Sequence, residues 1–255
     1  MDFEKAKTIS IIAFIILNIA LLSIRFYSPS LSAERIEAIN YVLNRKGIYI
    51  SEDFEFIRVN YKRQLELSHR NLDVHTIRPI FFINNQNVYN DQNIFYNSNE
   101  RITFLGENLI YENFGEYFPL NKETAREFAE NILNSLGITM TLDFEKVIEN
   151  GFKISYRGKY NNVILYHNQL IITVIEGNLS KINFSFIEPI SFFGPNRAIK
   201  PLDEALLAFA RNNAADKLKS VNIVYDLLSY EVSSPFFRII YTYNNFERSA
   251  LISAY

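Results

Sequence analysis

The sequence contains no cysteine, no tryptophan and only three histidines among its 255 residues. Without cysteine there is no disulfide framework and no thiolate metal site. Neither an H-E-x-x-H pattern nor a Cys/His spacing is present, so a zinc site would need ligands from distant parts of the chain. We therefore expect no metal and no cofactor.

Catalytic motifs are missing as well. The chain has no G-x-S-x-G elbow, no S-x-x-K pattern and no phosphate-binding G-x-x-x-x-G-K loop. Glu145 and Glu149 have the spacing of one helix face, for which a solvated surface pair is the common explanation. His167 follows Tyr166 on a predicted strand and is interpreted as packed or hydrogen-bonded. The sequence predicts a protein that is not an enzyme, with no catalytic residues.

Charge of one sign is not in excess, since 26 basic residues face 28 acidic ones. No basic stripe of the kind that follows a phosphate backbone is visible, which argues against nucleic acid as a partner. The 16 tyrosines and 22 phenylalanines are typical of half-buried sheets.

The longest hydrophobic run covers residues 9–24 and holds no charge, proline or glycine. A helix drawn over residues 6–27 reaches across a hydrocarbon core of about 30 Å if Lys7 and Arg25 extend to the head groups. We interpret it as a retained membrane anchor. A cleaved signal peptide, with Ser30-Leu31-Ser32 as its cleavage site, and a buried core helix are the alternatives, although the run has no polar face.

Asn18 lies near the middle of this run, where a side-chain amide is costly in lipid unless another polar group binds it. Pairing with its own helix backbone is one solution, and a partner helix is the other, which we favour. We expect the partner-facing residues of the transmembrane helix to be Ser10, Phe14, Leu17, Asn18 and Leu21.

The remainder has an α+β pattern of a helix followed by antiparallel strands. A helix is expected from Ser32 to Gly47, then strands near residues 57–62, 77–83, 102–105 and 109–111, with a loop over 84–99. We place a domain boundary near Pro119, giving a tail and transmembrane helix over 1–27 and α+β domains over 28–119 and 120–255.

The second half restarts with a helix capped by Asn121 and ended by Gly137. Its last residues match the first helix at an offset of ninety, with Leu43/Leu133, Asn44/Asn134, Gly47/Gly137 and Ile48/Ile138 as the pairs. Chance recurrence of a common cap and an internal duplication both explain this match.

Four alternating runs over residues 152–186 then predict a meander, with reversals at Asn168-Gln169 and Gly177-Asn178. A loop over 191–201 leads to a helix over 202–213, and strands near 223–228, 237–243 and 250–254 close the chain, the last two joined at Asn244-Asn245.

The amino terminus resembles that of the YycI family. Met1, Asp2, Lys7-Thr8-Ile9 and Leu17-Asn18 fit the family's opening, in which a tryptophan stands where this chain has Phe3. The segment Ser234-Pro235-Phe236-Phe237-Arg238 is similar to a Pro-aromatic-Arg strand near the family's end. Both ends and the length agree, while the middle matches only in layout.

This resemblance implies a membrane-anchored regulator of a two-component sensor histidine kinase of the WalK (YycG) type, acting in cell-wall homeostasis. The amino terminus would be cytoplasmic, and the chain from about Ser28 extracytoplasmic. The balance of Lys5 and Lys7 against Arg25 and Arg35 is too even to fix this orientation by charge. The helix would pack with the kinase and a YycH-like partner protein. From the residues alone, an anchored module that binds a peptide or wall fragment at a sheet edge is the alternative.

Overall fold

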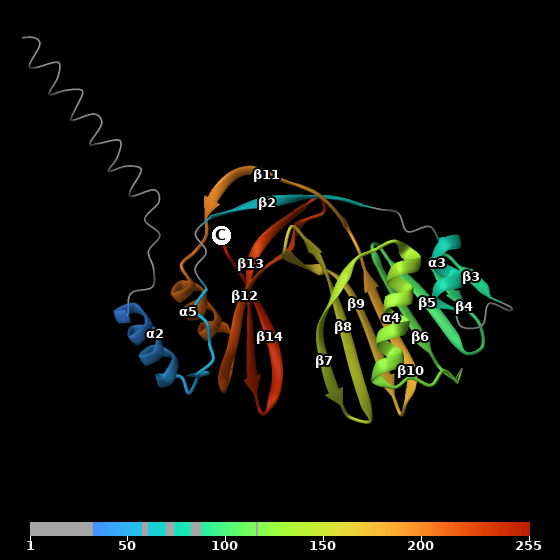
Figure 1. Ribbon diagram of the computed structural model, residues 1–255, viewed down its shortest axis with the longest axis horizontal. Helices are drawn as coiled ribbons and strands as arrows, with labels where there is room; N and C mark the ends of the chain where they lie inside the picture. Colours follow the sequence, from blue (N-terminus) through green and yellow to red (C-terminus); the bar gives the residue numbers. More distant parts are fainter. Residues whose placement is uncertain (1–32, 58–60, 70–73, 83–87, 116) are drawn as a thin grey trace, which may run out of the picture. The chain divides into compact units, whose positions relative to one another are not determined.

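The computed structural model describes residues 33–57, 61–69, 74–82, 88–115 and 117–255. Their fold is α+β, with four helices and a large, mixed, mostly antiparallel sheet (Figure 1). The predicted membrane span and its five partner-facing residues, Ser10, Phe14, Leu17, Asn18 and Leu21, lie outside the described residues. None of the described helices has the length and apolar composition that a bilayer crossing requires.

The described chain divides into two compact units. Unit 1 comprises residues 33–57, 61–62, 198–221 and 239–252, and unit 2 comprises 63–69, 74–82, 88–115, 117–197, 222–238 and 253–255. Each unit is therefore built from segments that are distant in sequence. The boundary predicted near Pro119 stays a prediction.

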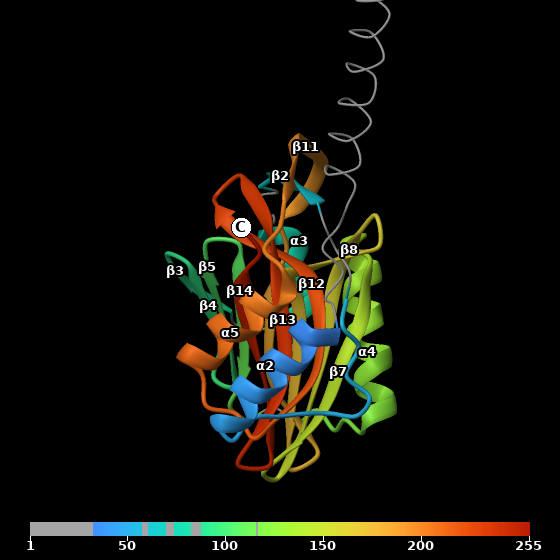
Figure 2. The ribbon, with the colours of Figure 1, turned by 90° about the vertical axis from the view of Figure 1, so that its left-hand side faces the viewer.

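Unit 1 is organised around two helices, α2 (Ala33–Arg45) and α5 (Leu202–Asn212), which lie side by side (Figure 2). Arg35 forms an ion pair with Asp203, and Lys46 donates to the carbonyl of Ala210 at 2.7 Å. The short strand β1 (Tyr49–Ile50) runs parallel to the start of β12 (Lys217–Ser229). The last five residues of β13 (Val232–Tyr243) and most of β14 (Phe246–Ser253) complete this unit.

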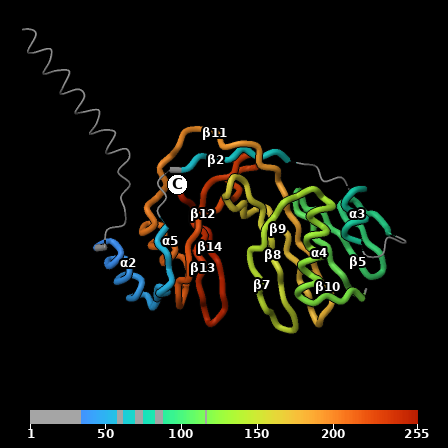
Figure 3. The backbone as a smooth tube through the Cα atoms, viewed as in Figure 1, coloured from blue at the N-terminus to red at the C-terminus, as the bar shows by residue number. Residues whose placement is uncertain are grey.

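Unit 2 is built on a ladder of antiparallel strands, which the tube in Figure 3 follows through successive hairpins. In spatial order these strands are β7 (Met140–Ile148), β8 (Gly151–Tyr160), β9 (Val163–Ile175), β10 (Asn178–Ser185), β6 (Asn108–Asn113), β5 (Glu100–Leu105), β4 (Ile94–Tyr96) and β3 (Tyr89–Asp91). Strands β2 (Tyr61–Ser68) and β11 (Glu188–Ala198) also belong mainly to this unit.

Helices α4 (Lys122–Leu136) and α3 (Val74–Phe81) bury the apolar face of this ladder. The core includes Ile132 and Leu133 of α4 and Ile154, Ile172 and Phe184 of the strands, all at most 4% exposed. Burial of apolar surface on this scale is the main stabilising contribution to the unit.

The predicted limits of α4 are confirmed. Asn121 caps the helix by accepting from the backbone N–H of Thr124 at 2.8 Å, and the Thr124 hydroxyl accepts from the N–H of Asn121 at 2.9 Å. Gly137 ends the helix in the left-handed region, with φ at 65°. Glycine reaches that region without steric cost.

The two matching helix ends form the same hydrogen bonds. The N–H of Ile48 donates to the carbonyl of Leu43 at 3.0 Å, and Ile138 donates to Leu133 at 2.9 Å. Gly47 and Gly137 donate to Asn44 and Asn134 in the same way. Both are Schellman motifs, in which a buried isoleucine follows the glycine. Chance recurrence and an internal duplication both still explain the match.

Some predicted elements are wrong. Residues 77–81 belong to helix α3, whose Ile77 and Phe81 lie four residues apart and are both buried. The loop predicted over 84–99 contains the hairpin of β3 and β4, and much of the loop predicted over 191–201 is strand β11. Glu145 lies on strand β7 and not on a helix.

The reversal predicted at Asn168-Gln169 is also wrong, because β9 continues through it to Ile175. The chain reverses instead at Asn161-Asn162, both with positive φ, and at Glu176-Gly177. The turn predicted at Gly177-Asn178 is thus confirmed to within one residue, as is the turn at Asn244-Asn245.

Candidate functional site

Strand β9 carries an irregularity in the middle of unit 2. Arg157 of β8 pairs with Gln169 of β9, and the next residue, Gly158, pairs with Leu165. Tyr166, His167 and Asn168 therefore have no partner on β8, which makes them a β-bulge of three extra residues. Before the bulge β9 also pairs with β12, and after it with β10.

Asn168 fixes the conformation of this bulge. Its side chain is fully buried, its amide nitrogen donates to the carbonyl of Ile187 at 2.8 Å, and its amide oxygen accepts from the N–H of Ile187 at 2.7 Å. Gly158 packs against it so closely that a Cβ there would lie 2.8 Å from the Cβ of Asn168. The absence of a side chain at Gly158 therefore helps the bulge to form.

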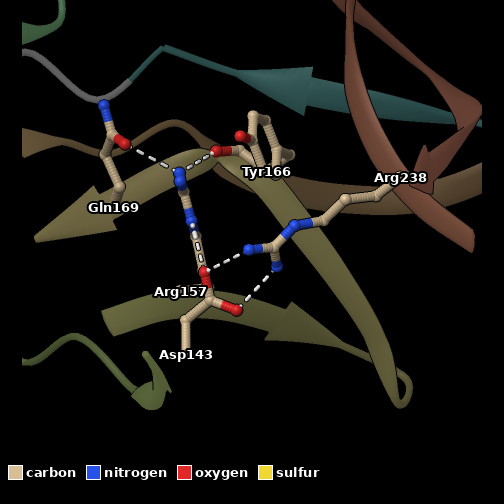
Figure 4. A network of polar contacts seen from close by, with 5 residues as sticks. All are labelled: Asp143, Arg157, Tyr166, Gln169 and Arg238. Atoms are coloured by element: carbon tan, nitrogen blue, oxygen red, sulfur yellow. Dashed lines mark hydrogen bonds and ion pairs between the residues drawn. The ribbon is translucent and has the colours of Figure 1, made fainter. Parts of the chain in front are cut away.

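Three charged side chains from separate strands meet beside the bulge: Asp143 of β7, Arg157 of β8 and Arg238 of β13 (Figure 4). Arg238 donates to Asp143 from Nη1 at 2.6 Å and from Nη2 at 3.0 Å, and Arg157 donates from Nε at 3.3 Å. All three side chains are at most 9% exposed. The cluster is a buried ion triad with two guanidinium groups on one carboxylate.

Arg157 makes further contacts to the bulge. Its Nη1 donates to the carbonyl oxygen of Tyr166 and, at 2.7 Å, to the side-chain oxygen of Gln169. The guanidinium groups of Arg157 and Arg238 lie 4.1 and 5.3 Å from the centroid of the Tyr166 ring, within the range of cation–π attraction. Burial lowers the pKa of Arg157, which still remains charged at neutral pH.

His167 lies at the centre of the bulge and is 8% exposed. Neither ring nitrogen has a hydrogen-bond partner among the residues that the structure describes, and Nδ1 is 4.0 Å from a carboxylate oxygen of Asp226. Burial, together with the positive charge of Arg157, lowers the pKa of His167 to about 4. Burial raises the pKa of Asp226. The interpretation of His167 as a packed histidine is confirmed.

This arrangement is better suited to holding neighbouring strands together than to acid–base chemistry. The carboxylate of Asp143 accepts from three guanidinium nitrogens, so both of its oxygens are engaged by other side chains. No nucleophile is hydrogen-bonded to His167. Within the described ranges, no three His, Cys, Asp or Glu side chains are grouped so that they could hold a metal ion. The triad therefore joins β7, β8 and β13.

Sequence reasoning gave none of the triad residues a place in a site. Arg238 was singled out only within the Ser234–Arg238 segment that resembles YycI, and Asp143 and Arg157 were not singled out. The predicted absence of catalytic, cofactor and metal residues stays a prediction.

No known protein-family model matches this chain, and no curated protein matches it. Several solved structures match this chain, and three of them follow. YycH from Bacillus subtilis is 9% identical with a TM-score of 0.50, and the match covers 77% of this chain and 56% of YycH. An uncharacterized protein from Eubacterium rectale is 12% identical with a TM-score of 0.49, covering 82% of this chain and 88% of that one.

The third structure is the C-terminal domain of YpeB from Bacillus megaterium, 8% identical with a TM-score of 0.37, covering 73% of this chain and 94% of that domain. At such low identities the likeness to YycH concerns the fold alone.

Proposed function

We propose that this protein is a non-enzymatic, single-pass membrane protein that regulates a two-component sensor histidine kinase of the WalK (YycG) type. In this proposal the anchor over residues 9–24 packs against transmembrane helices of the kinase and of a YycH-like partner. The amino terminus is cytoplasmic, and the two described units lie outside the membrane.

The observation that carries the proposal is the similarity in fold to YycH, which extends over 77% of the chain. The sequence resemblance to YycI, which rests chiefly on residues 1–18, is a second support. The buried triad agrees with a role that needs no reaction, because its carboxylate is engaged by two arginines.

Regulation through the anchor requires only that the helix binds two conformations of the kinase with different affinity. A polar residue in the span provides such a difference, because its amide is paired in one helix arrangement and exposed to lipid in another. Asn18 is the residue in this chain that meets that requirement.

Replacing Asn18 with leucine is expected to weaken the complex with the kinase in detergent. Interhelical hydrogen bonds of this kind contribute about 1–2 kcal/mol, which corresponds to a roughly tenfold higher dissociation constant. The measurement is co-purification of the kinase with the full chain, followed by titration of the purified partners. Ser23→Leu is the matched control, since Ser23 is a polar residue near the end of the span, and it should leave the affinity unchanged.

Replacing the whole run by an unrelated apolar span of equal length separates regulation from tethering. Loss of kinase control supports the proposal, whereas full control with the foreign span contradicts it. If no kinase co-purifies with the full chain, the proposal is also contradicted.

The absence of cysteine makes the orientation directly measurable. A single cysteine introduced as Glu52→Cys, at an exposed position, is expected to react with a membrane-impermeant maleimide on intact cells. A cysteine introduced as Lys5→Cys should react only after the cells are opened. The reverse pattern, or loss of residues 1–32 from the mature chain, would overturn the membrane topology proposed here.

A further inference from the structure

Strand β7 forms one edge of the ladder of unit 2. Eight of its nine residues pair with β8, with Asp143 left out at a bulge between Leu142 and Phe144, and no other strand pairs with β7 among the residues that the structure describes. The outward row of its backbone N–H and C=O groups is thus a free edge within this unit. Such an edge binds an added extended strand through backbone hydrogen bonds.

A groove of about 570 Å³ lies beside the start of β7 and the last turns of α4. Its apolar lining includes Leu133 of α4 and Leu142 of β7. Leu142 is 47% exposed and Val147, further along the same edge, is 72% exposed. Exposed apolar side chains on an edge strand are unusual in a protein that leaves the edge uncovered.

A buried tyrosine lines the groove. It is Tyr156 of β8, which is only 4% exposed. Burial and the nearby negative charge of Glu130 raise its pKa.

The charges of the groove do not cancel. Arg126 of α4 pairs with Glu145 of β7, which neutralises both side chains. Glu130, one turn further along α4, also lines the groove and has no ion pair in the described part of the chain. One uncompensated negative charge therefore lies next to the hydroxyl of Tyr156, and it is complementary to a basic side chain.

We propose that the edge of β7 and the groove beside it bind an extended polypeptide segment of a partner protein, which adds as a strand and places a lysine or arginine between Glu130 and Tyr156. Backbone pairing with β7 supplies the alternating donors and acceptors that only an extended polypeptide presents. Glu130 and Tyr156 supply the side-chain specificity. The inference does not depend on the proposed control of a kinase through the anchor.

The probe is a synthetic octapeptide of alternating valine and threonine with one central lysine, titrated by fluorescence anisotropy against the full chain in detergent. Two matched peptides test the two parts of the proposal. Replacing the lysine by glutamate should weaken binding roughly fivefold, as expected for loss of a partly exposed ion pair. Methylating alternate backbone nitrogens on the edge that faces β7 should abolish binding.

Variants of the protein locate the site. Glu130→Gln should make the lysine and glutamate peptides bind equally, and Tyr156→Phe should weaken the lysine peptide. Glu127→Gln, an exposed change on the same helix outside the groove, should leave both affinities as they are. Hydrogen exchange should slow at alternate amides of Met140–Ile148 when the lysine peptide is added.

Equal binding of the methylated peptide, protection on a different strand, or no binding at millimolar peptide would overturn the proposal. An identical response of Glu127→Gln and Glu130→Gln would overturn the role of the groove. Because these measurements involve neither the kinase nor the anchor, their failure is distinguishable from failure of the proposed regulation.

Discussion

Replacing Asp143 with alanine is expected to lower the free energy of unfolding by about 3–5 kcal/mol, because it removes one partner of a buried ion triad. Arg157 and Arg238, whose side chains are 6% and 8% exposed, would then face each other without a carboxylate between them. In a domain of this size, each kcal/mol lowers the melting temperature by about 2–4 °C, so a fall of roughly 10 °C is expected. Thermal and urea denaturation of the full chain measure it.

An exposed ion pair of the same unit provides the control. Arg101 pairs with Glu112 and its side chain is 45% exposed, so Arg101→Gln should change the free energy of unfolding by less than about 1 kcal/mol. If Asp143→Ala behaves like Arg101→Gln, the triad is more hydrated than its burial implies, and the prediction is wrong.

A triple variant separates the loss of the carboxylate from the loss of charge altogether. Asp143→Leu combined with Arg157→Met and Arg238→Met removes all three charges and keeps apolar volume between the strands. Buried ion pairs contribute little net stability because desolvation offsets their attraction, so this variant should recover most of what Asp143→Ala loses. A triple variant as unstable as Asp143→Ala would show that the hydrogen bonds of Arg157 to the bulge, and not the unpaired charge, dominate.

The features that could be predicted from the sequence are those set by residues close together in the chain. Helix α4 was predicted with its correct ends because Asn121 and Gly137 form their capping hydrogen bonds within five residues. The turn predicted at Gly177-Asn178 was found to within one residue, and the turn at Asn244-Asn245 was found as predicted, because glycine and asparagine tolerate positive φ. The α+β class followed from these local signals.

The features that were missed depend on partners distant in sequence. Asn168 is a good turn former, yet its side chain bonds to Ile187, nineteen residues further on, and this contact keeps β9 a continuous strand with a bulge. Residues 77–83 are rich in isoleucine and phenylalanine, as strands are, but Ile77 and Phe81, four residues apart, are both buried in the core shared with α4, which favours a helix. Tertiary packing has overridden local propensity at both places.

The charged cluster was missed for a related reason. Asp143 and Arg238 lie 95 residues apart in sequence, on strands β7 and β13. Nothing local to either residue predicts that they meet. The residues expected to contact a partner in the membrane, Asn18 among them, lie outside the described residues and stay a prediction.

Lowering the pH from 7 to 4 is expected to destabilise the wild-type protein by up to about 3 kcal/mol more than a His167→Leu variant. The folded chain keeps the pKa of His167 at about 4, because of burial and the nearby charge of Arg157, whereas an unfolded chain has the ordinary value of 6.5. Between these values the unfolded chain binds a proton that the folded chain does not. The stabilisation is therefore complete above pH 6.5 and is lost as the pH falls towards 4, and urea titrations at several pH values measure the loss.

Asp226 is the group that decides how large this effect becomes. Burial raises the pKa of Asp226, so its own titration stabilises the folded chain as the pH falls and acts in the opposite direction. Asp226 is present in both wild type and His167→Leu, so its effect cancels when their loss of stability is compared. The exception is a pairing of protonated His167 with Asp226 across the 4.0 Å that separates them. The Asp226→Asn background tests for that pairing. If His167 titrates alone, the extra loss of stability at low pH that histidine causes relative to leucine is the same in both backgrounds. If the pair forms, this extra loss is smaller with Asp226 than with asparagine. Parallel pH profiles of wild type and His167→Leu would show that the imidazole takes up its proton as readily in the folded chain as in the unfolded one.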